Sequence, residues 1–142
     1  MIERRTFAAI GAGLALVGVA GGAFGAHFLE GRVSGELLDV FETAVEYQMY
    51  HAFGLLMVGG LSPRPHAALN QWAGKLFVVG TIVFSGSLYL LALTGARWLG
   101  AITPIGGVCL LAGWGALCWS LISRPKMDAR TGDIASWTQG GG

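Results

Sequence analysis

The sequence predicts an all-α integral membrane protein, a four-helix bundle with both termini in the cytoplasm. Its 142 residues are 54% hydrophobic and only 12% charged, whereas soluble domains carry about 25% charged residues. The few charges are unevenly spaced, and three long stretches without any charge approach the roughly 20 apolar residues that one bilayer crossing needs. A soluble helical core could not bury three such stretches in a chain of this size, so we expect a multi-pass membrane protein.

The first, third and fourth crossings are expected to be ordinary apolar helices at residues 6–29, 68–94 and 103–123. Each of these stretches is uncharged over most of its length and has Lys or Arg at or near one end. Thr103 followed by Pro104 is typical of an N-cap and a first helical residue, which sets the start of the last helix.

The second crossing, expected at residues 37–61, differs from the others in composition. Its uncharged run, residues 47–62, has only 16 residues. Such a run gives about 24 Å of helix, which is shorter than the roughly 30 Å hydrocarbon core. The helix must therefore begin earlier and carry acidic residues to the membrane edge. Gly59 and Gly60, followed by Pro63, mark its end.

Lys and Arg residues predict the orientation, because the cytoplasmic loops of membrane proteins are enriched in them. With the N-terminus inside, the cytoplasmic side holds seven of them and the other side two: Arg4, Arg5, Arg64, Lys75, Arg124, Lys126 and Arg130, against Arg32 and Arg97. The four helices are expected to form one domain, residues 1–127, and residues 128–142 a flexible cytoplasmic tail. The first stretch also imitates a cleavable export signal, but the return of the chain to the membrane favours a retained helix.

Small residues recur on one face of the first helix with alternating four- and three-residue spacing. In lipid, helices associate through close backbone approach rather than through a hydrophobic driving force. We therefore expect a tight seam with another helix, either of this chain or of a second copy, although glycine pairs could instead let the helix bend. The predicted packing residues are Gly11, Gly18, Gly22 and Gly25.

Polar residues follow one half of the second helix when it is projected at about 100° per residue. In the predicted topology this stripe meets polar or glycine-rich segments of the other three helices in the outer half of the bilayer. An ionisable group at membrane depth costs about 2.5–3.5 kcal/mol, so Glu46 and His51 are expected to face the bundle interior or a wet cavity. Gln48, on the opposite half, is expected to hold another helix or a second subunit. The candidate polar layer is His27, Glu42, Glu46, Tyr47, Tyr50, His51, Ser85, Ser87, Tyr89 and Thr103.

Three interpretations of this layer stay open: an interhelical hydrogen-bond network, a binding or permeation site for a small ligand, ion or proton, and ligation of a metal or haem. His27 and His51 indicate a metal only weakly, because no partner at ligand spacing accompanies them, and no metal site is predicted. The chain has no nucleophile–base pair, phosphate loop or nucleotide fingerprint, so neither an enzyme nor a cofactor is predicted. A net charge of +1 offers no basic surface to nucleic acid.

Four segments resemble a known family. They read GAFGAH at 22–27, ETAVEYQMYH at 42–51, FSGSLY at 84–89 and ITPIGG at 102–107. In this order they resemble the domain of unknown function 423 family, small four-helix membrane proteins of the YgdD and YwdK type that are related to the mitochondrial transmembrane protein 256 group. The resemblance implies an uncharacterised protein of a bacterial inner or plasma membrane and transfers no catalytic residue.

Two functional hypotheses follow from the sequence. The first is a module that binds or passes a small ligand, ion or proton at the polar layer. The second is a structural or assembly subunit of a larger membrane complex, in which the polar layer serves only helix packing. Membrane lipid is the expected partner in both cases, and a homo-oligomer or a larger complex is compatible with both.

Overall fold

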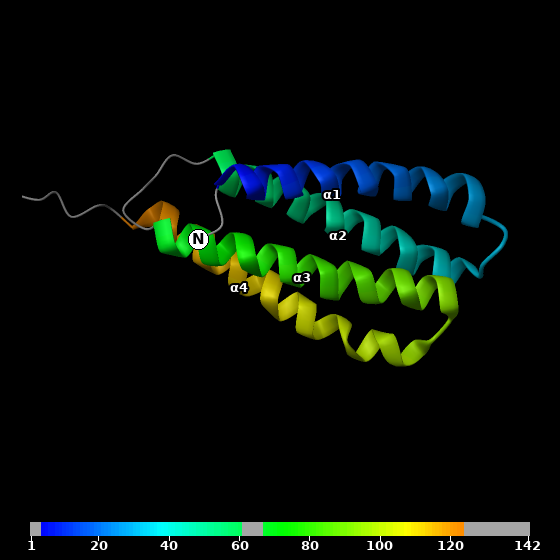
Figure 1. The fold of residues 1–142 in the computed structure, drawn as a ribbon. Helices are drawn as coiled ribbons and strands as arrows, with labels where there is room; N and C mark the ends of the chain where they lie inside the picture. The colour runs from blue at the N-terminus through cyan, green and yellow to red at the C-terminus, as the bar shows by residue number, and fades with distance from the viewer. Residues whose placement is uncertain (1–3, 61–66, 124–142) are drawn as a thin grey trace, which may run out of the picture.

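The structure is a computed structural model that describes residues 4–60 and 67–123, and these residues are helical almost throughout (Figure 1). The predicted all-α, four-helix fold is confirmed. Helix α1 differs from its prediction because its last turn widens into a π-helix, in which the Glu30 amide donates to the Gly25 carbonyl. In chain order the elements are α1 (Arg4–Phe24), the π-helical turn η1 (Gly25–Leu29), α2 (Gly35–Gly60), α3 (Ala67–Thr94), the 3-10 turn η2 (Arg97–Ala101) and α4 (Thr103–Ile122).

Three of the helical segments in the described ranges are long and apolar enough to cross a membrane: Arg4–Leu29, Ala67–Thr94 and Arg97–Ile122. Helix α2 is not among them, although its 26 residues give about 39 Å of helix. Its first half carries the acidic residues, and Gln48, Tyr50 and His51 make the following turns less apolar than the other helices. The proposed domain end at residue 127 and the tail 128–142 lie outside the described residues.

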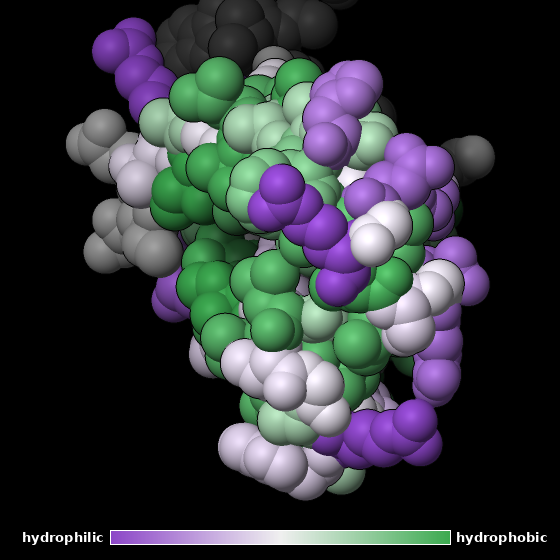
Figure 2. Space-filling view, turned by 90° about the vertical axis from the view of Figure 1, so that its right-hand side faces the viewer, coloured by the Kyte–Doolittle hydropathy of each residue, from purple (hydrophilic) through white to green (hydrophobic). Residues whose placement is uncertain are grey.

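Successive helices run antiparallel, so that the start of α1 and the end of α4 lie at the same end of the molecule (Figure 1). At the opposite end, the α1–α2 and α3–α4 connections each contain a glycine with positive φ, Gly31 at 76° and Gly95 at 70°, a conformation that other residues rarely adopt. Ser34 caps α2, because its hydroxyl accepts a hydrogen bond from the Leu37 amide. Viewed from this end, hydrophilic side chains stand out over a largely apolar body (Figure 2).

Helices that are neighbours in sequence make the extensive contacts: α1 packs on α2, α2 on α3, and α3 on α4. The glycine face of α1 lies against α2 of the same chain. A Cβ atom on Gly11 would lie 2.7 Å from the Ala52 carbonyl oxygen, and one on Gly25 would lie 3.1 Å from the Phe41 ring. Gly18 faces Met49 in the same way, whereas Gly22 is exposed at the edge of the seam. Because these glycines have no side chain, the backbones of α1 and α2 can approach each other closely.

Two apolar clusters fill the bundle, one toward each end. The larger one contains Phe7 of α1, Leu55 of α2, Phe77 of α3 and Leu117 of α4. The smaller one, near the connections, is built on Leu29, Phe41 and Ala92. The buried polar contacts described next connect the helices around and between these clusters.

Candidate functional site

Gln48 connects three helices from the centre of α2. Its side chain is 4% exposed. The amide nitrogen donates to the Leu14 carbonyl of α1 at 2.7 Å, and the amide oxygen accepts from the Tyr89 hydroxyl of α3 at 2.9 Å. The uncharged Gln48 side chain thus forms hydrogen bonds with the helices on both sides of α2.

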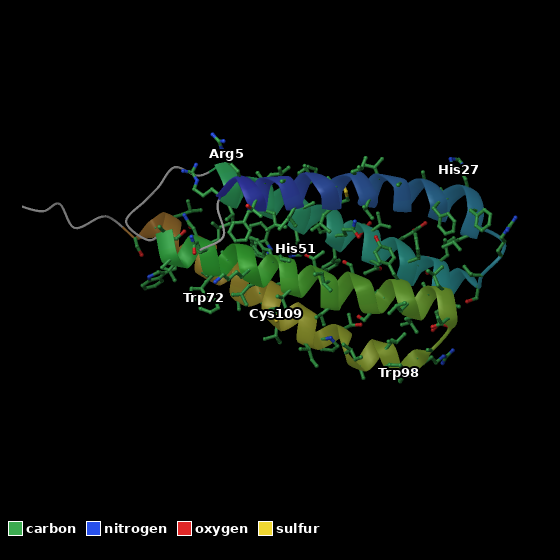
Figure 3. The ribbon with its side chains drawn as sticks, viewed as in Figure 1. Arg5, His27, His51, Trp72, Trp98 and Cys109 are labelled. Carbon is green, nitrogen blue, oxygen red and sulfur yellow. The ribbon has the colours of Figure 1, made fainter. Side chains whose placement is uncertain are left out.

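His51 forms the corresponding link from α2 to α4. The Trp114 indole N–H donates to His51 Nε2 at 3.1 Å, and His51 Nδ1 lies 2.6 Å from the Tyr47 carbonyl oxygen. Because an indole N–H only donates and a carbonyl only accepts, the arrangement requires the neutral imidazole with its proton on Nδ1. In Figure 3, His51 points into the bundle, as the sequence predicted. Both of its ring nitrogens are occupied by protein groups.

Two further contacts join α3 to α4. Ser87 lies 2.8 Å from the Thr103 hydroxyl, and the Ser120 hydroxyl donates to Asn70 at 2.5 Å. The prediction that Thr103 caps α4 through its side chain is wrong: Thr103 is already helical, and no side chain caps this end. Since η2 carries the chain in a helical turn up to Ile102, the Thr103 hydroxyl instead donates back to the Leu99 carbonyl.

Two hydroxyls one turn apart on α3 are buried among the described residues without a hydrogen-bond partner, those of Thr81 and Ser85. Their residues are 3% and 2% exposed. Thr81, Ser85 and Tyr89 follow one another at four-residue spacing and therefore share one face of α3. Of these three side chains, only that of Tyr89 has a described partner.

The acidic residues of α2 do not face the bundle interior, so of the two environments expected for Glu46 only the cavity remains. Glu42 and Glu46 are exposed and border a cavity of about 240 Å³ between α1 and α2, beside Gly22 and Gly25. Carboxylates packed against Leu14 and Tyr89 would lack the cation that buried charges need. The amide of Gln48 takes that position instead.

His27 does not join the layer either. Gly25 and Leu29 are buried against α2, and His27, midway between them along the helix, is exposed on the opposite side. Figure 3 shows its ring pointing away from the bundle. The sequence placed His27 in the polar layer, but the helical repeat turns it outward.

A lateral groove lies between α2 and α4 and has a volume of about 490 Å³. Tyr47, Tyr50 and His51 form one wall, Phe84 of α3 lies at the base, and α4 forms the other wall. The Tyr47 ring stacks on Phe84 with centroids 4.5 Å apart. The groove opens outward, since Tyr50 is 55% exposed and Leu111 75% exposed. The α4 residues that line it are Gly107, Leu110, Leu111 and Trp114.

The groove lies near the middle of the bundle. Tyr47 is 12 residues after Gly35 and 13 before Gly60, the ends of α2, which places it about 18–20 Å from either end. Within the described part of the chain, the hydroxyls of Tyr47 and Tyr50 have no hydrogen-bond partner. These phenols are the groups that the groove can offer to another molecule at mid-depth.

Three residues of this arrangement were absent from the predicted layer: Trp114, Asn70 and Ser120. Gln48 was predicted to hold another helix or a second subunit, and it holds two helices of this chain, but it was not placed in the layer. A pattern in the sequence could have identified it, because the buried residues of α2 include a run with alternating three- and four-residue spacing that holds both Gln48 and His51, as in a coiled-coil seam. That run is Phe41, Ala44, Gln48, His51, Leu55 and Val58.

Within residues 4–60 and 67–123, no group of three or more His, Cys, Asp or Glu side chains is arranged to hold a metal ion. The polar side chains at the centre instead form separate links between helices. The open groove is aromatic and uncharged, so its chemistry suits an apolar molecule with a hydrogen-bonding group.

Four antiparallel helices, three of them apolar enough to span a bilayer, define a small multi-pass membrane protein. Residues 21–107 match the family model described as protein of unknown function (DUF423), and the chain belongs to this family. The resemblance recognised from the four sequence segments is thereby confirmed.

Relatives in two bacterial genera extend this comparison. A UPF0382 membrane protein of Staphylococcus haemolyticus is 51% identical over 110 residues, which cover 78% of this chain and 89% of the relative. The UPF0382 membrane protein YwdK of Bacillus subtilis is 45% identical over 111 residues, 78% of this chain and 90% of the relative. No solved structure matches the chain significantly. The chain is thus similar to bacterial membrane proteins, in agreement with the predicted location.

Proposed function

We propose that this protein is a membrane-embedded binding module that takes a small, largely apolar molecule from the bilayer into the groove between α2 and α4. The observation that carries the proposal is the groove itself, open to the side at mid-depth and lined by aromatic rings with two free phenols. Its volume of about 490 Å³ falls within the roughly 300–1,000 Å³ of small-molecule sites.

Binding is better supported than permeation. Gln48 and Tyr89 use their hydrogen-bonding groups between helices, and His51 uses its ring nitrogens on Trp114 of α4 and on the Tyr47 carbonyl of its own helix. The larger apolar cluster, which includes Leu55 and Phe77, fills the bundle toward the end where α1 begins. An ion would have to cross this cluster without polar contacts, at a high desolvation cost.

Native mass spectrometry of the protein released from mild detergent tests the proposal, with two exposed positions of α4 as a matched pair. Leu111 lines the groove, whereas Val108, 66% exposed, does not. We expect a small-molecule adduct on the wild type and on Val108→Trp, and its loss from Leu111→Trp, whose ring fills the groove. Absence of an adduct from all three proteins after extraction from native membranes would contradict the proposal.

A role as a subunit of a larger complex is the second candidate, and the outer face of α2 favours it. Glu42 and Glu46 are exposed on this helix, and Glu46 lies 11 residues after Gly35, about 16 Å along the helix. A carboxylate at such depth is unfavourable against lipid, so a partner protein would cover this face. A photo-crosslinking residue at Glu46, compared with one at Ile82 on the exposed face of α3, should then capture a protein only from Glu46. Equal labelling by lipid at both positions would count against this role.

The orientation stays a proposal and follows from the Lys and Arg distribution alone. Both chain ends lie on the cytoplasmic side, together with the α2–α3 connection. The 25–35 and 94–103 segments, with Arg32 and Arg97, then face the opposite side.

A further inference from the structure

We infer that the ligand of the α2–α4 groove carries an uncharged, flat ring with carbonyl oxygens and a hydrocarbon tail, the chemistry of a quinone-type lipid. This inference rests on the proposed function and names the ligand class of that site. It is drawn from three properties of the groove: which hydrogen bonds remain available, which charges are present, and what shape its walls have.

The available hydrogen bonds come from phenols. His51 uses both ring nitrogens on Tyr47 and Trp114, and the Trp114 N–H is used in the same bond. This leaves the hydroxyls of Tyr47 and Tyr50, which have no partner in the described chain. A ligand that covers these hydroxyls must accept hydrogen bonds from them, because an unpaired buried hydroxyl is unfavourable. Carbonyl oxygens do so without bringing a charge.

The charge of the groove excludes an ionic headgroup. None of the described residues that line it is Asp, Glu, Lys or Arg. An anion or cation bound at this depth would find no counter-charge, and burial of an unpaired charge is costly. The ligand head must therefore be neutral, which disfavours the phosphate of a common phospholipid.

Aromatic side chains form most of the walls of the groove. Tyr47 lies between Phe84 and Tyr50, with centroid distances of 4.5 and 5.9 Å, and Trp114 stands across from them beside His51 at 6.1 Å. Aromatic faces at such spacing favour stacking or edge contacts with a further planar ring. Gly107 has no side chain and so leaves space at the opposite wall. Leu111, at the outer end of the groove, is exposed toward the lipid. A ring in the groove with its tail in the bilayer satisfies all these features.

The test is a titration of the full-length protein in phosphatidylcholine nanodiscs with 2-decyl-1,4-benzoquinone, compared with decylcyclohexane, which has the same tail and no carbonyl. Binding is measured by calorimetry and by the shift of the thermal unfolding midpoint, which rises when a ligand binds the folded state. We expect saturable binding of the quinone and none of decylcyclohexane. Tyr50→Phe should weaken quinone binding about fivefold, the range of one lost hydrogen bond, and Leu111→Trp by more than about tenfold.

Val108→Trp, on the same helix but outside the groove, should bind the quinone as the wild type does. Equal binding of decylcyclohexane and the quinone, or quinone binding that Tyr47→Phe and Tyr50→Phe both leave unchanged, would overturn the ligand class while leaving the groove as a site. Failure of Leu111→Trp to weaken any bound molecule, native or added, would instead overturn the proposed function. Circular dichroism and gel filtration of each variant separate these outcomes from misfolding.

Discussion

Replacement of Gln48 by Leu is expected to lower the free energy of unfolding by about 1–3 kcal/mol. The substitution removes two interhelical hydrogen bonds, to the Leu14 carbonyl at 2.7 Å and from the Tyr89 hydroxyl at 2.9 Å. Such bonds in membrane proteins contribute on average about 0.6 kcal/mol each and at most about 1.7. The half-buried Tyr89 hydroxyl would in addition lose its partner, and a buried unpaired group costs about 1–3 kcal/mol. Leucine has a similar volume, so the effect reports hydrogen bonding more than packing.

A double-mutant cycle with Tyr89→Phe isolates the bond between the two side chains. Unfolding measured by steric trapping in bicelles should give a coupling energy of about 0.6–1.7 kcal/mol, because the double variant no longer leaves either group unpaired. The control cycle pairs Gln48→Leu with Tyr50→Phe, whose hydroxyl has no partner in the described chain, and should show no coupling. Equal coupling in the two cycles, or none in either, would refute the assignment of Gln48 as the link between α2 and α3.

Three further predictions concern packing, the His51 link and topology. Gly11→Ala should destabilise the bundle by about 1–3 kcal/mol, since its Cβ would lie 2.7 Å from the Ala52 carbonyl oxygen. The control Gly13→Ala should leave the stability unchanged, because a Cβ at Gly13 meets no atom within 4 Å. Equal losses of stability for the two variants in steric trapping would be incompatible with an α1–α2 seam. Trp114→Phe should lose about 0.6–1.7 kcal/mol in the same assay, because it removes the bond to His51, and a stability equal to that of the wild type would disprove that bond. A reporter enzyme fused after Gly142 should be active only in the cytoplasm, and periplasmic activity would overturn the orientation.

The sequence accounts well for the helices themselves. Uncharged runs bounded by Lys, Arg, glycine and proline predicted four crossings, and the observed bounds Gly35–Gly60 and Ala67–Thr94 differ from the predictions by no more than two residues. These signals are local, because one helix in a bilayer must satisfy its own backbone and bury enough apolar length. The widening of α1 into a π-helix at Gly25 was not predicted, since the sequence carries no local signal for it.

The sequence accounts less well for the candidate site. It identified His51, Ser87 and Tyr89 as polar residues at membrane depth, and the structure connects each of them to another residue. It could not identify the groove, because its walls come from two helices that are distant in the chain, with Tyr47 on one and Trp114 on the other. Trp114 on its own looked like any aromatic residue of an apolar helix.

The sequence by itself determined the number and length of the helices, the unusual acidity of the second one, and the family. Only the tertiary structure decided which side of α2 turns inward. Polarity pointed to the side of Glu46, yet the buried side is the one that carries Gln48. The physical reason lies in the partners: α1 offers a carbonyl and α3 a phenol at that level, and these give both the nitrogen and the oxygen of a neutral amide a partner. A carboxylate would be left there without a cation, so the acidic face of α2 turns outward.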